Sequence, residues 1–142
     1  MGINQVLIEL TVEFPPSVNR LWRAVPGRGV IKSKIYREYM EKNLWIIKQQ
    51  STGKITGKYI ISFEASRPDK RKRDLDNLIK PLSDLLVQAG VTEDDSLCEE
   101  LTAKWVNNGT GVKIFIRAAQ GPEGEVLSFP SGRASKTTRE AA

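Results

Sequence analysis

The first part of the chain changes its hydrophobic period twice. Apolar and polar residues alternate over residues 5–13 (QVLIELTVE), which predicts a strand with one buried face. Residues 14–30 (FPPSVNRLWRAVPGRGV) are rich in proline and glycine, so we expect a loop. From Lys34 to about Gln50, apolar side chains recur at helical spacing, and Ser33 can cap the helix start. The pattern therefore predicts a strand, a loop and an amphipathic helix.

A second strand and a second helix follow. Residues 58–65 (KYIISFEA) predict a strand that leads directly into a basic segment. A helix is then expected from about Asp76, because leucine and isoleucine side chains fall on one face at a period of 3.6 residues. Gly90 is suited to a left-handed cap at its end, and Pro81 predicts a kink in its first turns.

The last patterned stretch is β-like. Residues 97–106 (LCEELTAKWV) and 112–118 (VKIFIRA) flank the turn-rich NNGTG, which suggests a hairpin. Residues 121–142 are rich in Gly, Ser, Thr and Pro and are expected to form a flexible tail beyond a single domain of residues 1–120. These elements predict an α+β fold, with a small mixed sheet packed against two main helices.

Composition narrows the possible chemistry. The 142 residues include no histidine and one cysteine, Cys98, which excludes an internal disulfide, the usual Cys/His zinc sites and catalysis by a histidine base. No apolar run reaches the ~20 residues that span a bilayer, and the N-terminus lacks a targeting pattern, so we expect a cytoplasmic protein without a membrane. The net charge of +5 is compatible with a nucleic-acid partner.

The candidate chemistry begins in residues 67–76 (RPDKRKRDLD). Two carboxylates, Asp74 and Asp76, follow a dense group of cations. Side chains two residues apart point about 200° from each other on a helix but the same way in an extended segment, so cooperation requires Asp74 to be non-helical. Lys80 lies four residues after Asp76, on the same helical face. The cations of this basic segment are Arg67, Lys70, Arg71, Lys72 and Arg73.

A metal would explain why carboxylates gather here. Asp94 and Asp95 follow the second helix and return toward Asp74 and Asp76 if that helix packs back on a sheet. Grouped carboxylates repel one another unless a cation lies between them, and ligation by oxygen alone suits Mg²⁺, with Mn²⁺ as a substitute. Such an ion can activate water for attack on a phosphate, and Lys80 can stabilise the developing charge.

Each piece has a commoner interpretation when taken alone. Asp74 and Asp76 can be helix caps, the Asp76/Lys80 pair an ordinary surface ion pair, and Asp94 with Asp95 part of a solvated loop. The basic segment can be a solvated face or a protein-binding patch. A non-catalytic basic DNA-binding protein is therefore an alternative. The combination of carboxylates, Lys80 and cations favours a nuclease, in which the basic segment holds the DNA backbone.

The order of these residues resembles a known family, the RusA-like Holliday junction resolvases. The resemblance rests on residues 71–96 (RKRDLDNLIKPLSDLLVQAGVTEDDS), and on FPPSVNRLWR and GRGVIKSKIYREY before them, and it spans roughly residues 12–118. It implies a homodimeric, Mg²⁺-dependent enzyme that cuts four-way DNA junctions by paired symmetric nicks. By position it implies Asp74, Asp76 and Asp95, rather than Asp94, as catalytic metal ligands. Lys80 is implied as the essential lysine, and Arg73 as a DNA contact, to which we add Arg20, Arg23 and the rest of the basic segment.

Overall fold

The computed structural model describes residues 7–17, 22–27, 29–50, 52–107 and 109–119. For residues 22–25 and 29–32 it describes the backbone but not the side chains. The predictions for Arg20 and for the tail of residues 121–142 lie outside the described residues, and so does the prediction for the Arg23 side chain.

The observed elements follow the predicted order closely. Within the described part of the chain, no helix is long and apolar enough to cross a membrane. The elements are β1 (Leu7–Val12), β2 (Trp22–Val25), β3 (Gly29–Lys32), α1 (Lys34–Gln49), β4 (Tyr59–Ser66), the 3₁₀ turn η2 (Leu75–Leu78), α2 (Ile79–Gln88), the 3₁₀ turn η3 (Asp95–Leu97), β5 (Cys98–Val106) and β6 (Val112–Ala118).

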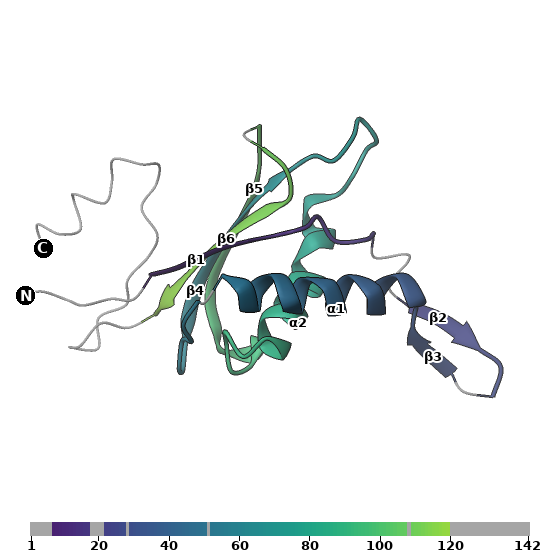
Figure 1. Cartoon of the computed structure of the whole chain (residues 1–142), viewed down its shortest axis with the longest axis horizontal. Coiled ribbons are helices and arrows are strands. Elements are labelled where there is room, and N and C mark those ends of the chain that lie inside the picture. Colours follow the sequence, from purple (N-terminus) through teal and green to yellow (C-terminus); the bar gives the residue numbers. More distant parts are fainter. Residues whose placement is uncertain (1–6, 18–21, 28, 51, 108, 120–142) are drawn as a thin grey trace, which may run out of the picture.

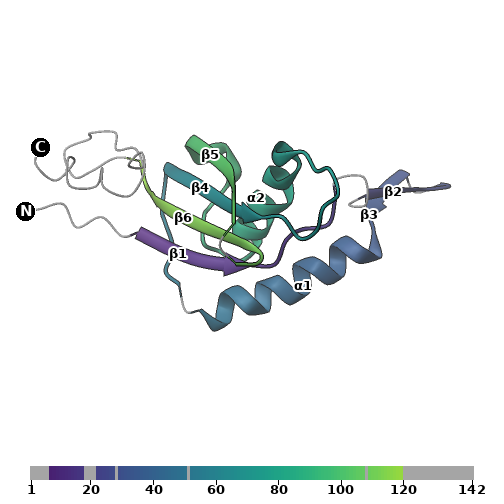
Figure 2. The same ribbon diagram turned by 90° about the horizontal axis from the view of Figure 1, so that it is seen from above.

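The main sheet has four strands in the order β1-β6-β4-β5 (Figure 1). β5 is parallel to β4, whereas β6 is antiparallel to both β1 and β4. Apolar side chains from these strands and from α1 and α2 form one core, and α1 lies alongside β1 (Figure 2). The predicted α+β fold with a small mixed sheet and two main helices is therefore confirmed.

The predicted hairpin of residues 97–106 and 112–118 is wrong. β5 and β6 are not paired with each other, because β4 lies between them. Burial explains the order: β4 buries side chains on both faces, including the adjacent Tyr59, Ile60 and Ile61, whereas no β5 side chain is fully buried. A strand that is apolar on both faces belongs in the middle of a sheet, and a half-exposed one belongs at an edge.

The segment predicted to be a loop contains a small hairpin. β2 and β3 pair from Trp22↔Lys32 to Val25↔Gly29, and this hairpin projects beyond the start of α1 (Figure 2). Gly27 lies between the strands with φ of +79°, a left-handed conformation that favours glycine. The proline and glycine signal thus identified the turn, but the strands were too short to show a period.

The second helix begins as a 3₁₀ turn. Residues of η2 precede α2, so Pro81 lies in the first turn of the α-helix, where its missing N–H removes no helical hydrogen bond. The change from 3₁₀ to α geometry comes before Pro81, and the kink expected at Pro81 stays a prediction. Gly90 has φ of +77° directly after the C-cap Ala89, as predicted for a left-handed end.

Side chains of α1 fix the end of β1. Asn43 is fully buried, and its side-chain oxygen accepts from the backbone N–H of Glu13 at 2.8 Å. The Tyr39 hydroxyl donates to the Glu13 carbonyl at 2.7 Å. Because both the N–H and the carbonyl of Glu13 are held by α1, the segment that follows, Phe14 to Ser17, leaves the sheet in a defined direction.

Candidate active site

The basic segment is organised around one carboxylate, Asp69. Its Oδ2 lies 2.9 Å from Nη2 of Arg71 and also 2.9 Å from Nη2 of Arg73. Its Oδ1 accepts from the backbone N–H of Arg71 at 3.0 Å. The hydrogen bonds from Arg73 and then Arg71 hold the pKa of Asp69 well below its usual range, so the carboxylate is charged at neutral pH.

Two aromatic rings lie against Arg73 and a further arginine, Arg67. The rings of Phe14 and Trp105 stack at 6.0 Å with an angle of 13° between their planes. Arg67 lies over Trp105, 4.3 Å from the ring centroid, and Arg73 lies over Phe14 at 5.2 Å. The order Arg67, Trp105, Phe14, Arg73 therefore forms a layered stack, which we call the arginine–aromatic stack. It joins the ends of β1, β4 and β5.

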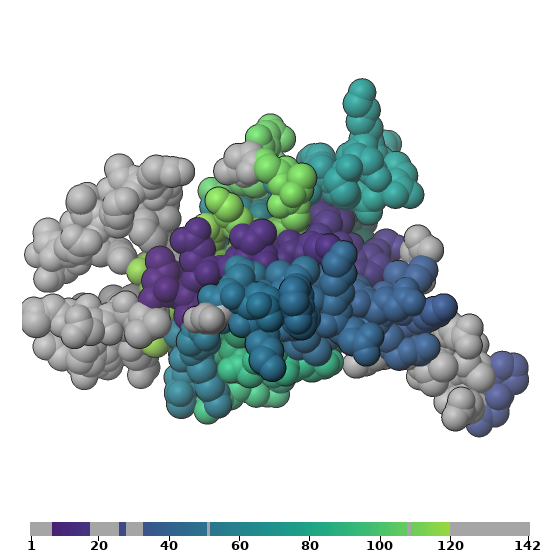
Figure 3. Space-filling model, in the orientation of Figure 1, coloured from purple at the N-terminus to yellow at the C-terminus, as the bar shows by residue number. Residues whose placement is uncertain are grey.

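A pocket of about 380 Å³ opens beside this stack. One wall is the segment Phe14–Ser17, and the other is Arg71–Asp74 with Asn77 and Leu78. The loop that follows β4, teal in Figure 1 and Figure 3, projects from the body of the molecule. Three of the predicted cations, Arg71, Lys72 and Arg73, therefore meet the first predicted carboxylate at one pocket, together with the proline-containing segment Phe14–Ser17.

Asp74 has the backbone that cooperation with Asp76 requires. Its φ of −90° and ψ of 126° are extended, as predicted. Its side chain makes no capping hydrogen bond to the 3₁₀ turn that follows, so the Asp74 carboxylate does not act as an N-cap. Among the described residues, neither Asp74 nor Asp76 has a side-chain hydrogen bond or an ion pair, although five cations precede them in sequence.

Lys80 lies among carboxylates from α2 and η3. Its Nζ is 3.0 Å from Oδ1 of Asp84 and 3.8 Å from Oδ2 of Asp95. The hydrogen bond to Asp84, more than any other contact, raises the pKa of Lys80, so the amine is a cation at neutral pH. The described ion pairs of Lys80 thus involve Asp84 and Asp95, and the surface pair with Asp76 is not formed.

Asp84 is itself fixed by the first helix. The hydroxyl of Tyr36, a fully buried residue of α1, donates to Oδ2 of Asp84 at 3.1 Å. The contacts therefore run from α1 through Tyr36 and Asp84 to Lys80, and from Lys80 to Asp95. This arrangement holds the ammonium group of Lys80 on the side of α2 that faces η3.

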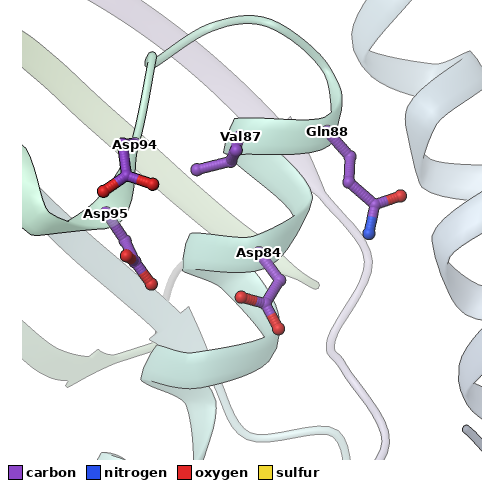
Figure 4. A pocket seen from close by; sticks show the side chains of 5 residues that line it. All are labelled: Asp84, Val87, Gln88, Asp94 and Asp95. Carbon is purple, nitrogen blue, oxygen red and sulfur yellow. The ribbon is translucent and has the colours of Figure 1, made fainter.

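The two aspartates before β5 have different surroundings. Asp94 accepts from the backbone N–H of Ser96 at 3.0 Å and from its hydroxyl, and these hydrogen bonds lower the pKa of Asp94. Asp95 is exposed and contacts Lys80. Both line a pocket of about 290 Å³, facing Asp84 across it (Figure 4). Asp94 therefore caps the 3₁₀ turn η3, whereas Asp95 contacts Lys80.

The three predicted metal ligands are near the same helix but are not assembled. Asp74 and Asp76 come before α2 in the sequence. Asp95 comes after α2 in the sequence but contacts Lys80, which belongs to the first turn of that helix. Over the described ranges, no group of three or more Asp, Glu, His or Cys side chains is placed to hold a metal ion. Their shared role as ligands therefore stays a prediction.

Sequence reasoning missed several residues that organise this region. Asp69 lies in a run of cations, and because this segment is not helical, its spacing of two and four residues from Arg71 and Arg73 gave no rule for their ion pairs. Tyr36 follows the apolar spacing of its helix, and no local signal links it to Asp84, 48 residues away. Phe14 and Trp105 gave no sign of their mutual stacking either.

Comparison with known proteins identifies the family. The family model of the endodeoxyribonuclease RusA matches residues 13–117, which include every element from η2 to β5 and most of the remaining fold. The chain belongs to the RusA family. This confirms the resemblance seen in the sequence, and it means that the chain is a member of a family of DNA-hydrolysing enzymes.

Individual relatives of the RusA family agree. The chain is 34% identical over 94 residues to the crossover junction endodeoxyribonuclease RusA of Enterobacteria phage HK97, covering 66% of this chain and 78% of the phage protein. It is 35% identical over 111 residues to the protein of the same name from Aquifex aeolicus, covering 75% and 86%. The Escherichia coli K12 protein of that name is 36% identical over 90 residues, covering 61% and 72%.

Proposed function

We propose that this chain is a Mg²⁺-dependent endodeoxyribonuclease that resolves four-way DNA junctions by paired, symmetric hydrolysis of phosphodiesters. The observation that carries the proposal is the pocket in which Arg71, Lys72 and Arg73 line the same wall as Asp74. Cations suited to the DNA backbone are thus adjacent to a carboxylate without a partner among the described residues. The names of the relatives supply the junction as substrate.

The donor chemistry of the predicted ligands fits a divalent ion. Asp74, Asp76 and Asp95 offer carboxylate oxygens, which suit Mg²⁺ and its substitute Mn²⁺. Asp74 and Asp76 have no competing cation among the described residues, whereas Asp95 would exchange a contact with Lys80. When bound, the ion would supply an activated water and would neutralise charge on the phosphate under attack, which these side chains do not provide.

Lys80 has the properties of an electrostatic stabiliser. Its Nζ is held by Asp84 and remains a cation at neutral pH. We propose that it stabilises the negative charge that develops on the scissile phosphate, with Asp95 beside it. A protonated lysine cannot accept a proton from water, so a role as general base is not part of the proposal.

Paired nicks require two active sites, which we propose come from a homodimer. A four-way junction has near two-fold symmetry, so two identical subunits can address equivalent strands. Mixing wild-type and Asp76→Asn subunits tests this directly. Mixed dimers should nick one strand and leave the junction unresolved. Resolution should therefore fall as the square of the wild-type fraction, and a fall that is linear in the wild-type fraction would contradict the two-site proposal.

The central experiment compares a four-way junction with a linear duplex of equal length, with and without Mg²⁺. We expect paired nicks in the junction and none in the duplex, only when Mg²⁺ is present. Asp76→Asn should abolish cleavage but preserve junction binding, since it removes one proposed ligand and also a negative charge near the phosphate. Loss of folding in this variant would favour a structural capping role for Asp76.

The same assay decides the alternative of a non-catalytic DNA-binding protein. Tight junction binding without Mg²⁺-dependent nicks would support that alternative and reject the nuclease. Replacing Mg²⁺ with Mn²⁺ should restore cleavage, whereas Ca²⁺ should support binding without comparable cleavage, because its larger size and flexible geometry suit an in-line attack less well.

A further inference from the structure

The basic segment contains an anion site that is already filled. One oxygen of Asp69, Oδ2, lies 2.9 Å from Nη2 of Arg71 and 2.9 Å from Nη2 of Arg73. Arg71 also donates from Nε to the same oxygen at 3.1 Å. Two guanidinium groups that converge on one oxygen form the arrangement in which arginines hold phosphate oxygens.

The surroundings prepare this site for exchange. Asp69 and its arginines lie in the segment between β4 and η2, and the Asp69 side chain is 37% exposed. Arg73 is only 18% exposed, because it lies on Phe14, so its position does not depend on Asp69 alone. Arg71 is 76% exposed. Ion pairs at such exposure are weak, and an anion that approaches from solvent can replace one partner.

From this geometry we infer that Asp69 occupies, in the DNA-free protein, a phosphate site of Arg71 and Arg73, and that a backbone phosphate of DNA displaces it. The inference rests on the DNA-binding part of the proposed function and not on the cleavage chemistry. Asp69 then acts as an internal competitor that weakens sequence-independent attraction to DNA. It also draws both arginines toward itself, which leaves the neighbouring Asp74 without a cationic partner among the described residues.

A binding experiment tests the competition. Fluorescence anisotropy with a labelled four-way junction and a labelled linear duplex, in EDTA and over a range of salt, measures affinity without cleavage. Asp69→Asn keeps the shape of the side chain and removes its charge. We expect two- to five-fold tighter binding of both DNAs, about the gain from releasing one exposed ion pair. The slope of log K against log salt should steepen by about one unit, since one more phosphate contact forms.

The matched control is Glu38→Gln, which removes one exposed carboxylate paired with Lys34 at 3.9 Å on α1. It should change the affinity by less than half the effect of Asp69→Asn, and the salt slope should stay unchanged. Asp69→Glu, which keeps the charge, should bind DNA like the wild type. Asp69→Ser is a second neutral variant if Asp69→Asn is unstable.

Three results would overturn the inference. Weaker binding by Asp69→Asn would mean that Asp69 orients the arginines for DNA and does not compete with it. Equal gains in Asp69→Asn and Glu38→Gln would mean that only net charge matters. An unchanged salt slope would mean that no new phosphate contact forms. Because these readings need no metal, they stay informative even if the protein proves unable to cut a junction.

Discussion

Asp69 and Lys80 have opposite electrostatic surroundings. Asp69 is a single carboxylate between two arginines, and Lys80 is a single ammonium between two aspartates. They differ in how they are held. The contacts of Asp69 are with residues two and four positions away in one exposed loop, whereas those of Lys80 link α2 to η3 and, through Asp84 and Tyr36, to α1. The contacts of Asp69 can therefore be replaced by contacts with another anion, whereas the contacts of Lys80 fix the position of its ammonium group.

The difference separates binding from chemistry. A local cluster on a loop can release its partner when DNA arrives, at little cost to the fold. A cluster that joins three elements keeps its shape, as electrostatic stabilisation of a reacting phosphate requires. Asp74 and Asp76 lie between the two clusters in sequence and, among the described residues, pair with neither. Variants in either cluster therefore test this distinction.

Removing Lys80 should have the largest effect. Lys80→Met keeps the aliphatic stem but leaves Asp84 and Asp95 without their shared cation. We expect the single-turnover rate of junction cleavage to fall by about 100-fold or more, the usual result of deleting a preorganised charge. Junction binding measured in EDTA should change little.

The control for this variant is Lys58→Met, which deletes a similarly exposed lysine paired with Glu99 at 3.9 Å. That variant should cut at nearly the wild-type rate. If Lys80→Met also cuts normally, the cluster around it has no role in the reaction.

Loosening Lys80 should cost less than removing it. Asp84→Asn preserves the volume of the side chain but removes the charge that holds Nζ at 3.0 Å. The cleavage rate should fall by about ten-fold through loss of positioning, with DNA affinity unchanged. Glu64→Gln is a close control, because Glu64 and Asp84 are exposed by 23% and 21% and each pairs with a lysine. Similar losses in both variants would show that Asp84 acts through general charge.

The arginine–aromatic stack can be weakened by a substitution that keeps most of the apolar volume of the replaced ring. Phe14→Leu removes the ring that stacks on Trp105 and supports Arg73. We expect a loss of about 1 kcal/mol in the free energy of unfolding, measured in urea, beyond the loss from reduced apolar area. Junction affinity should also fall, because Arg73 loses its support.

Phe115→Leu provides the comparison for this variant. Phe115 is half-buried on β6 and has no ring contact within the described ranges. It should lose stability without loss of DNA affinity. Normal junction binding by Phe14→Leu would show that Arg73 is positioned by Asp69 alone.

The fold was predictable from the sequence where the period of the side chains determines the element. The alternation before Glu13 and the helical spacing after Ser33 predicted β1 and α1. The predicted cap is confirmed, because Ser33 Oγ accepts from the backbone N–H of Tyr36 at 3.1 Å. Strand pairing was not predictable in the same way. Two strands joined by NNGTG looked like a hairpin, but the stronger burial of β4 placed it between them.

In the candidate site, too, local features were predictable and contacts between distant residues were not. Local spacing singled out Lys80 and the requirement for an extended Asp74, whereas Asp95 was selected over Asp94 only by the resemblance to the family; the structure brings Lys80 and Asp95 within 3.8 Å of each other. Contacts between distant residues were not visible, because nothing near Tyr36 in sequence indicates a carboxylate partner on α2. The internal pairing of the basic segment by Asp69 was hidden for another reason: ion pairs within a charged run cannot be assigned from charge counts.

The smallest effect is expected from Tyr36→Phe, which leaves the Lys80–Asp84 contact but removes the hydroxyl that fixes Asp84. Burial, and then the nearby Asp84, raise the pKa of Tyr36 above its usual value near 10. Because the folded state holds this proton more tightly than the unfolded state, its contribution to stability is complete below pH 10 and declines as the pH rises further. The variant should lose about 1 kcal/mol at pH 7 and show a shallower decline above pH 10.

Tyr39→Phe separates the structural part of this effect from the positioning part. Burial also raises the pKa of Tyr39, but its hydroxyl donates to the carbonyl of Glu13, away from Lys80. Both variants should therefore lose stability with the same dependence on pH, measured by urea unfolding from pH 7 to pH 11. Only Tyr36→Phe should slow cleavage, and by less than Asp84→Asn does. Equal cleavage rates in the two tyrosine variants would mean that the fixed geometry of Lys80 ends at Asp84 and does not extend to α1.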